Sequence, residues 1–472
     1  MSSAPAVSLG PDEIERGLRL VIRDGVCTQI LITLIGGVFL TDFALGLGAS
    51  SLAIGVIMAV PALGNLFQLP AIALVEAIRR RRAIVVVTSG PARALFFVIV
   101  VLPLLPILPQ TAIVVLIVAL AAIHGLGSVS HCAWNSWMRD LVPSARLGSF
   151  FGRRMMVMAA LGAVLAPLAG AYIDGFRSVW PDLANDVYVP LFAVGAVAGM
   201  AGVWVLALTP EPPMLPAGHA PRFTARALAP LRDPAFRGVL LFLFAWNATV
   251  NLAAPFFAAY MLARLGLDVG LATLFFAVFQ LANLVAYGPW GRIADRHANR
   301  AVLGLCVPLF IMAIPGFVMA ALPTAPVAVV GWLLALHIVL GLAHAGVQLT
   351  GTTVAIKLAP RAESTAYLAA VHLVVNGAAG VAPILGGWFV AALAGFAQPL
   401  ALPWRHEPFV LVGWDVLFLL AFVCGLGAVL AVSSIREAGT IGRWRALAEF
   451  AAELRVEFRS GARWLTRRWS KA

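Results

Sequence analysis

Charged residues are scarce in this chain of 472 residues, because only 11% of them are Asp, Glu, Lys or Arg. Soluble domains carry roughly 25% charged and about 45–50% apolar residues, whereas 61% of this chain is hydrophobic. A core of this size cannot hide so much apolar surface, so lipid is expected to be the solvent for most of the chain. The composition therefore excludes an ordinary soluble protein.

Cysteine is equally rare, and the four cysteines stand singly in or beside apolar runs. They are Cys27, Cys132, Cys306 and Cys424. Without a CxxC spacing or a paired framework, the sequence predicts no disulfide and no metal site. It also lacks the GxxxxGK[ST] phosphate-binding loop, so we expect no direct use of ATP and no cofactor. The first 25 residues are polar and the first apolar run is long, which predicts no cleavable signal peptide.

Long apolar runs, in contrast, are abundant. A helix needs roughly 20 apolar residues to cross a bilayer, and helices are expected because they satisfy their own backbone in lipid. The sequence predicts twelve spans, at about 26–46, 51–75, 83–103, 111–137, 150–173, 187–209, 237–263, 269–290, 301–322, 326–356, 364–394 and 409–432.

The positions of the basic residues support this count. With the N-terminus placed in the cytoplasm, 29 of the 33 Lys and Arg residues fall in cytoplasmic segments and three, Arg177, Arg264 and Arg405, fall outside. Such a bias is the positive-inside pattern, and it accounts for the net charge of +12 without a nucleic-acid partner. We therefore predict an all-α, multi-pass integral membrane protein with both termini cytoplasmic, in the inner membrane if the source is bacterial.

The chain also repeats itself. "QLPAIALVEAIRRRRAIV" after the second span resembles "YGPWGRIADRHANRAVL" after the eighth, with Glu76 opposite Asp295. "LGAVLAPLAGAY" in span five resembles "AAGVAPILGGWF" in span eleven, with Pro167 opposite Pro383. These matches predict two six-helix pseudo-repeats. The expected parts are an amphipathic segment (1–25), the first half (26–209), a linker (210–236), the second half (237–432) and a basic amphipathic tail (433–472).

The segment "GPWGRIADRHANR" after span eight resembles the signature loop of the major facilitator superfamily, whose members are secondary transporters. The copy after span two departs from the pattern, because Leu69 and Ile72 replace the glycines and Glu76 replaces the aspartate. The resemblance covers all twelve spans and implies a twelve-helix fold whose two halves move against each other. The residues with which we associate gating are Glu76, Arg81, Gly288, Gly291, Asp295, Arg296 and Arg300.

Two interpretations of the signature loop remain open. Glycines let helices approach closely in membranes, and a carboxylate at a helix end can be held by a helix N-terminus or an arginine. The loop could thus be a latch that forms in only one arrangement of the halves, or it could simply orient the helices by charge. "GAVLAPLAG" in span five is similar to the glycine-proline motif of family antiporters, with Ala166 at a glycine position, or is only a proline kink.

Polar side chains gather in the spans that line the transport pathway in the resembled family. His124, Ser128, His131 and Asn135 in span four share one helical face. Adding 213 to 124, 131 and 135 gives His337, His344 and Gln348 in span ten, so this stripe is repeated. The other candidate cargo-binding residues are Gln29 and Thr33 in span one, Asn247 and Asn251 in span seven, and the nearby Trp134 and Trp246. Alternatively, these groups only hydrogen-bond between helices.

No carboxylate stands out in this set, so the proton-coupling candidates are His131, His344 and Asp42, near the outer end of span one. Asp42 could equally be an exposed acid. Arg93 inside span three is expensive in hydrocarbon, and could bind an anionic group or pair with a buried acceptor.

The function favoured by the sequence is secondary transport of a small organic or amphipathic solute by alternating access, proton-coupled and directed to export. The alternatives are a transporter-fold receptor or assembly factor, a lipid- or lysolipid-translocating member, and, least favoured, a membrane enzyme. The expected partners are a small-molecule substrate and membrane lipids, and the expected state is a monomer. In the tail, Trp444, Leu447, Ala451, Leu454, Phe458 and Leu465 form one apolar stripe, which predicts a helix lying on the membrane surface.

Overall fold

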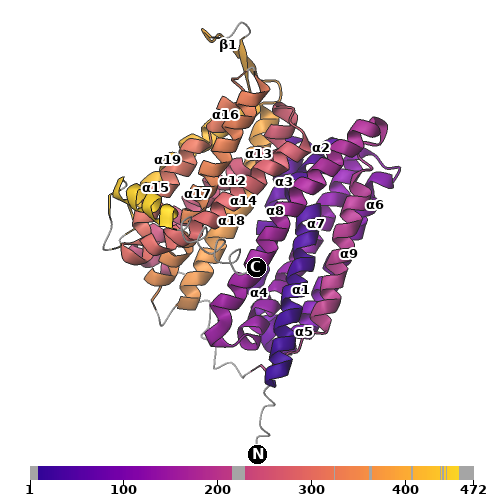
Figure 1. Cartoon of the computed structure of the whole chain (residues 1–472), viewed down its shortest axis with the longest axis vertical. Helices are drawn as coiled ribbons and strands as arrows, with labels where there is room; N and C mark the ends of the chain where they lie inside the picture. Colours follow the sequence, from indigo (N-terminus) through magenta and orange to yellow (C-terminus); the bar gives the residue numbers. More distant parts are fainter. Residues whose placement is uncertain are drawn as a thin grey trace, which may run out of the picture. The chain divides into compact units, whose positions relative to one another are not determined.

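The computed structural model describes residues 9–214, 229–323, 325–360, 364–404, 408–435, 437, 441–442 and 444–456. The described chain is helical apart from one hairpin (Figure 1). It forms two compact units, and each is described by itself. Unit 1 comprises Met1–Pro221, Pro255–Ala277 and Ala379–Ala392, and unit 2 comprises Arg222–Ala254, Val278–Ala378 and Leu393–Ala472.

The helices of the first half all belong to unit 1. They are α1 (Pro11–Ile35), α2 (Gly37–Gly46), α3 (Ser51–Asn65), α4 (Gln68–Ile78), α5 (Arg81–Ala94), α6 (Phe96–Val101), α7 (Pro109–Leu141), α8 (Leu147–Val179) and α9 (Tyr188–Ala207), with short 3₁₀ turns at Leu102–Leu104, Ser144–Arg146 and Pro181–Leu183.

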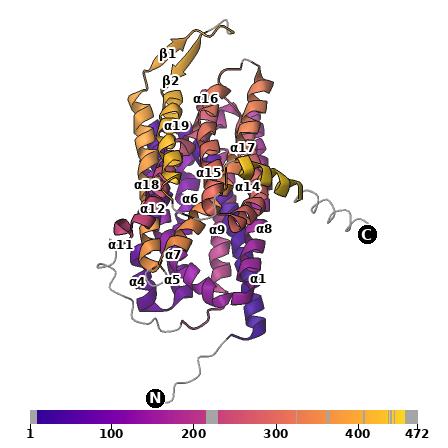
Figure 2. The same ribbon diagram turned by 90° about the vertical axis from the view of Figure 1, so that its left-hand side faces the viewer.

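The second half runs from α11 to α19. Its elements are α11 (Ala229–Arg232), α12 (Pro234–Ala253), α13 (Phe257–Ala259), α14 (Val269–Arg296), α15 (Asn299–Ala313), α16 (Gly316–Ala320), α17 (Pro326–Leu358), α18 (Ser364–Ala392), β1 (Ala397–Leu400), β2 (Phe409–Val412) and α19 (Gly413–Val432), with a 3₁₀ turn at Ala254–Phe256 and a π turn at Tyr260–Arg264. The two strands pair antiparallel, Ala397 opposite Val412. They project beyond the end of α19 (Figure 2).

Within the described chain, ten helices are long and apolar enough to cross a membrane, and the bent pair of α3 and α4 would make eleven. The region predicted as the ninth span, 301–322, is instead divided into α15 and α16. Pro315 lies between them, and proline interrupts the helical hydrogen-bond ladder. The all-α, multi-pass prediction is confirmed, while the count of twelve and the cytoplasmic termini remain predictions.

The first helix differs from the boundary drawn from the sequence. The amphipathic segment before Val26 does not form a separate element, because α1 is continuous from Pro11 to Ile35. The chain then breaks at Gly36 and Gly37, before α2. Gly37 has a φ of 55°, a left-handed conformation that glycine adopts without strain. Polar residues just before Val26 therefore belong to the same helix as the first span.

The repeated proline-glycine motif makes equivalent helix contacts in unit 1. A Cβ added to Gly170 in α8 would lie 2.8 Å from Gly270 Cα in α14, and one on Gly387 in α18 would lie 2.4 Å from Ser51 O in α3. In the same contact between α3 and α18, a Cβ added to Gly55 of α3 would lie 2.2 Å from Pro383 O. Small residues therefore permit these backbones to touch, as they do at membrane helix interfaces.

One contact has an additional polar component. Asp174 in α8 accepts hydrogen bonds from Val269 N (3.1 Å) and Gly270 N (2.7 Å), the first two residues of α14. The equivalent helix of the first repeat, α3, is capped locally, because Ala53 N donates to Ser50 Oγ at 3.2 Å. The N-terminus of α14 thus receives its cap from a different helix.

We predict that Gly55→Ala lowers the thermal stability of the purified protein. The new methyl group would overlap the Pro383 carbonyl, and overpacking of this kind costs about 1–3 kcal/mol. Gly125→Ala in α7 is the matched control, since no atom lies within 4 Å of its added Cβ. A melting temperature in detergent that is unchanged by Gly55→Ala would show that α3 and α18 are not packed this closely.

Candidate functional site

The polar stripes of α7 and α17 end in the same local arrangement. Asn135 Nδ2 lies 3.3 Å from His131 Nδ1 in α7, and Gln348 Nε2 lies 3.3 Å from His344 Nε2 in α17. In both pairs the amide lies one helical turn after the histidine, and His131, Asn135 and Gln348 are exposed. The two pairs use different ring nitrogens, and His344 Nδ1 also lies 3.3 Å from Asn283 Nδ2. The spacing seen in the sequence is therefore repeated, whereas the atoms in contact differ.

The other members of the stripes lie deeper. His337 in α17 is 1% exposed, lies 2.7 Å from Leu333 O and packs edge-on against Phe317. Ser128 in α7 is 3% exposed, and His124 lies against Gly64 of α3. Ser128 and His337 thus contribute to packing within each half, whereas His124, His131, Asn135, His344 and Gln348 remain partly accessible.

The polar candidates of spans one and seven form hydrogen bonds within their own helices. Gln29 Nε2 donates to Thr33 Oγ1 at 2.9 Å in α1. Asn247 and Asn251 in α12 each donate to the carbonyl four residues earlier, at 2.8 Å. All four are partly exposed, and each of these hydrogen bonds lies within a single helix.

The two tryptophan candidates differ. Trp246 is 6% exposed and packs edge-on against Phe310 inside unit 2. Trp134 is partly exposed, stacks in parallel with the His131 ring, and carries the guanidinium of Arg154 at 5.0 Å from its ring centre. Only Trp134 thus presents a ring beside a charged group.

A buried carboxylate that the sequence interpretation missed lies in α1. Asp24 is 3% exposed, and its Oδ1 lies 3.4 Å from Arg93 NH2, while Oδ2 lies 3.7 Å from Arg154 NH2. Thr28 Oγ1 donates to the same carboxylate at 3.3 Å. The buried acceptor expected for Arg93 is therefore Asp24. The residue escaped notice because the predicted span began at Val26, which left Asp24 in the polar leader.

Asp42, a candidate for proton coupling, lies in a second ion pair of unit 1. Arg177 NH1 in α8 lies 2.8 Å from Asp42 Oδ2, and the Tyr188 hydroxyl of α9 donates to the same oxygen. Asp42 itself is 9% exposed. The alternative of an exposed loop acid is therefore wrong, and the pair ties α2 to α8 and α9.

The two copies of the signature loop are engaged differently. Arg81 in the first copy is fully buried, bonds the Asp140 carboxylate and donates to Ser136 O at 3.0 Å and Pro212 O at 2.6 Å. Its backbone N–H donates to Glu211. Arg81 therefore fastens the first residues of the linker to the end of α7.

In the second copy, acidic residues of the tail hold the basic side chains. Glu453 accepts from Arg292 Nε at 2.7 Å and from Arg296 NH1 at 2.6 Å, and Glu449 Oε2 lies 2.7 Å from His297 Nε2. Phe450 stacks on Trp290, with 3.8 Å between ring centres. The tail helix, residues 444–456, lies across the ends of α14 and α15 (Figures 1 and 2).

The docked face of this helix consists of Ala446, Phe450 and Glu453, which are at most 9% exposed. The apolar stripe predicted to lie on the membrane points elsewhere, since Trp444 is 84% and Leu447 41% exposed. Phe458 and Leu465 lie outside the described residues. That the apolar stripe lies on the membrane remains a prediction. A second face of the same helix, with Ala446, Phe450 and Glu453, packs against protein.

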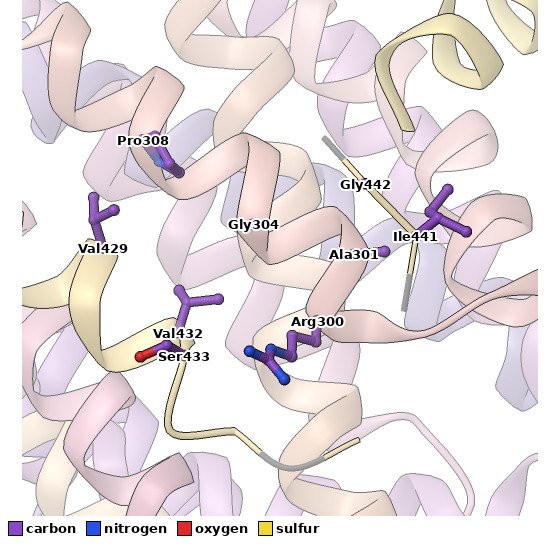
Figure 3. A pocket seen from close by; sticks show the side chains of 9 residues that line it. All are labelled: Arg300, Ala301, Gly304, Pro308, Val429, Val432, Ser433, Ile441 and Gly442. Carbon is purple, nitrogen blue, oxygen red and sulfur yellow. The ribbon is translucent and has the colours of Figure 1, made fainter. Parts of the chain in front are cut away.

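Arg300 completes this arrangement. Its backbone N–H and Asn299 Nδ2 donate to the two carboxylate oxygens of Glu437, at 3.0 and 2.9 Å. Its side chain points into a pocket of about 220 Å³ between α15, α19 and the start of the tail (Figure 3). The pocket is lined by Arg300, Ala301, Gly304, Pro308, Val429, Val432, Ser433, Ile441 and Gly442. The tail therefore contacts the second copy of the loop through Arg292, Arg296, His297 and the start of α15.

The remaining gating candidates make few contacts. Glu76, Gly288 and Asp295 are exposed, and a Cβ added to Gly291 would meet nothing closer than Leu349 Cδ2 at 3.7 Å. Nothing in this structure requires glycine at 291. The close packing that small residues provide occurs instead at Gly55, Gly170 and Gly387.

A further polar pair was not anticipated. Asn376 Nδ2 lies 3.3 Å from His372 Nδ1 in α18 and donates to His372 O at 2.9 Å. The His-x-x-x-Asn spacing is the same as that of His131 and Asn135, and could have revealed it. It was missed because 372 has no equivalent histidine in the first repeat.

The long apolar helices and their exposed apolar side chains indicate a multi-pass integral membrane protein. A family model described as "Major Facilitator Superfamily" matches residues 248–466. This match covers a little under half of the chain, and it supports the resemblance to that superfamily. No curated protein sequence matches it.

Solved structures with this fold include several transporters. A variant of the nucleoside transporter NupG has a TM-score of 0.68 at 13% identity, covering 90% of this chain and 100% of the other. A POT family transporter in complex with 5-aminolevulinic acid has a TM-score of 0.58 at 14% identity, with coverages of 90% and 96%. A bacterial homolog of the human lysosomal transporter Spinster, inward-facing and unoccupied, has a TM-score of 0.55 at 17% identity, with coverages of 97% and 99%. The family and its neighbours support solute transport.

We predict that docking of the tail helix depends on its carboxylates. The hydrogen bond from Arg292, followed by that from Arg296, lowers the pKa of Glu453, and the hydrogen bond from His297 lowers the pKa of Glu449. Because docking lowers the pKa of these carboxyl groups, their contribution to the free energy of docking is complete above the ordinary pKa of 4.5. This contribution is lost as the pH falls through the lower pKa of the docked state. At pH 7, Glu453→Gln should accelerate hydrogen exchange of residues 444–456, and its difference from wild type should shrink below pH 4.5.

Asp295→Asn is the control for this experiment, since Asp295 is in the same loop and exposed. Equal exchange of the tail in Glu453→Gln and Asp295→Asn at pH 7 would contradict the docking of Glu453.

Proposed function

We propose that this protein moves a small organic or amphipathic solute across the membrane by alternating access, coupled to protons and in the export direction. The observation that carries the proposal is the matched pair of histidine–amide groups, His131 with Asn135 and His344 with Gln348. The pairs lie on equivalent helices of the two repeats, α7 and α17, and are shifted by one helical turn relative to each other. In transporters built from repeats, cargo sites form between the two repeats.

The chemistry of these pairs suits reversible binding. An imidazole and an amide together offer both donors and acceptors, so they can bind a polar solute without a fixed charge. Polar groups within membrane helices are costly and are retained mainly where they serve a pathway. An imidazole can also take up and release a proton, and His131 and His344 are therefore the proposed carriers of the coupled proton. We retain Gln29, Thr33, Asn247 and Asn251 as secondary cargo contacts.

The duplicated glycine contacts of unit 1 provide a means of gating. Gly170 with Gly270, and Gly387 with Ser51, join helices of the two repeats at the ends predicted to be external. Such contacts rely on surface fit and on few polar bonds, so they can separate without leaving many unpaired groups. We propose that they form the external gate, and that the docked tail and the buried Arg81 stabilise the opposite ends of the two repeats.

We predict that His131→Ala combined with His344→Ala abolishes transport without unfolding the protein. Both side chains are partly accessible, so their loss leaves no large cavity. Proteoliposomes would be assayed with a panel of nucleosides, 5-aminolevulinic acid and lysophospholipids, the first two being compounds named for structural neighbours. Melting temperatures of wild type and variant provide the control for folding, and undiminished flux would remove the histidine pairs from the mechanism.

We also predict that flux depends on an imposed pH gradient. For proton-coupled export, an inward proton gradient should accelerate the outward movement of solute several-fold, and reversing the gradient should slow it. The measurement follows the transported member of the same panel together with a pH-sensitive dye inside the vesicles. Flux that is identical under both gradients would exclude proton coupling.

A further inference from the structure

Two guanidinium groups share one carboxylate inside unit 1. Asp24 of α1 lies between Arg93 of α5 and Arg154 of α8, at 3.4 and 3.7 Å. The side chains of both arginines are only 12–13% exposed, and that of Asp24 is 4% exposed. The three groups therefore carry one positive charge in excess. Helical rise places Arg93 roughly 18 Å and Arg154 roughly 10 Å from the start of their helices, so Arg93 lies deeper in its span than Arg154.

Arg93 makes three hydrogen bonds. Its NH1 donates to Gly199 O at 2.8 Å, and its NH2 donates to Thr28 Oγ1 at 3.0 Å and to Asp24. A Cβ added to Gly202 in α9 would lie 2.3 Å from Arg93 NH1, so the guanidinium also fills the space left by this glycine. Arg93 is thus a structural partner of Asp24, fixed between α1, α5 and α9.

Arg154 is held less tightly. Its Nε lies 3.4 Å from Val21 O and its NH2 lies 3.7 Å from Asp24, both at the long limit for hydrogen bonds and ion pairs. The main additional contact is the face of Trp134. A guanidinium has five N–H donors, and these contacts use few of them. Arg154 consequently retains donors for a further acceptor.

A buried charge that is only weakly paired is costly, and an ionisable group in a membrane helix is a candidate ligand site. The excess charge here is positive, so the ligand that would compensate it is an anion. Guanidinium binds carboxylate, phosphate and sulfonate groups with two parallel hydrogen bonds. The aromatic neighbours Trp134, Phe151 and His131 add a flat apolar surface beside it.

We propose that Arg154 and Trp134 form a binding site for an organic anion, with the anionic group on Arg154 and a flat apolar body against Trp134. The inference rests on the proposed transport function, since it names the class of solute that would occupy the first repeat. It also assigns a role to Asp24, which competes with the ligand for Arg154. A bound anion therefore weakens the ion pair between Asp24 and Arg154, and ionised Asp24 weakens the binding of the anion.

The test uses naphthalene derivatives that share one body and differ in charge. Isothermal titration calorimetry on the purified full chain would compare 2-naphthoate, 2-naphthalenesulfonate and 2-naphthyl phosphate with the neutral 2-naphthamide. At least one anion should bind tenfold or more tightly than the amide. Failure of all three anions to bind, or equal binding of the amide, overturns the proposal.

Three variants locate the site. Arg154→Gln should remove the preference for the anion, Arg154→Lys should retain part of it, and Asp24→Asn should strengthen anion binding several-fold by removing the competitor. Arg146→Gln is the matched control, because Arg146 lies at the start of the same helix, is 57% exposed and pairs with Glu15. It should bind like wild type. Binding of naphthoate to Arg154→Gln at the wild-type level contradicts the assignment.

These outcomes are separable from failure of the proposed function. A protein that binds naphthoate through Arg154 but moves no solute in vesicles retains the anion site and loses the transport proposal. A protein that transports a neutral solute through the histidine pairs, and binds the amide as well as the anion, retains transport and loses the anion site.

Discussion

The cost of an unpaired charge in hydrocarbon is the constraint on which this structure depends. It explains why only 11% of the residues are charged and why most of these lie at helix ends. It also explains the few that do not, because Asp24 with Arg93 and Asp42 with Arg177 are ion pairs within the helical region of unit 1. Each pair joins helices that are distant in sequence. Charge pairing thus sets which helices of the first half are neighbours, and small residues then set how closely others approach.

The duplicated sequence is used unequally. The proline-glycine motif makes equivalent contacts in both copies, at Gly170 and Gly387, because those contacts depend only on small size. The signature loop, in contrast, makes different contacts in its two copies. Arg81 binds the linker in the first copy, whereas the tail binds Arg292 and Arg296 in the second. A motif whose partners lie outside the repeat has no reason to keep the same contacts in both halves.

Much of the fold could be predicted from apolar runs and arginine positions, because lipid imposes both directly. The polar stripes of α7 and α17 were likewise visible in the sequence, although their offset of 213 residues differs by one helical turn from the offset of 217 between the two helices. The partners of Arg93 were not, since a carboxylate 69 residues away in the sequence meets it only through packing of α1 on α5 and α9. The tail was assigned a single apolar face. Its docked face includes Glu453, a residue that an amphipathic pattern counts as solvent-exposed, so only the opposing arginines reveal the contact.

The cap that Asp174 lends to α14 has an energetic consequence. Any arrangement that parts α8 from α14 removes both hydrogen bonds at once and leaves two N–H groups at a helix start to find water. Loss of a helix cap costs about 0.5–2 kcal/mol, which corresponds to roughly a two- to thirty-fold bias in population. These two hydrogen bonds therefore favour, by that factor, the form in which α8 and α14 are in contact. A cargo would have to bind the form in which α8 and α14 are separated more tightly, by a similar factor, in order to shift the population toward that form.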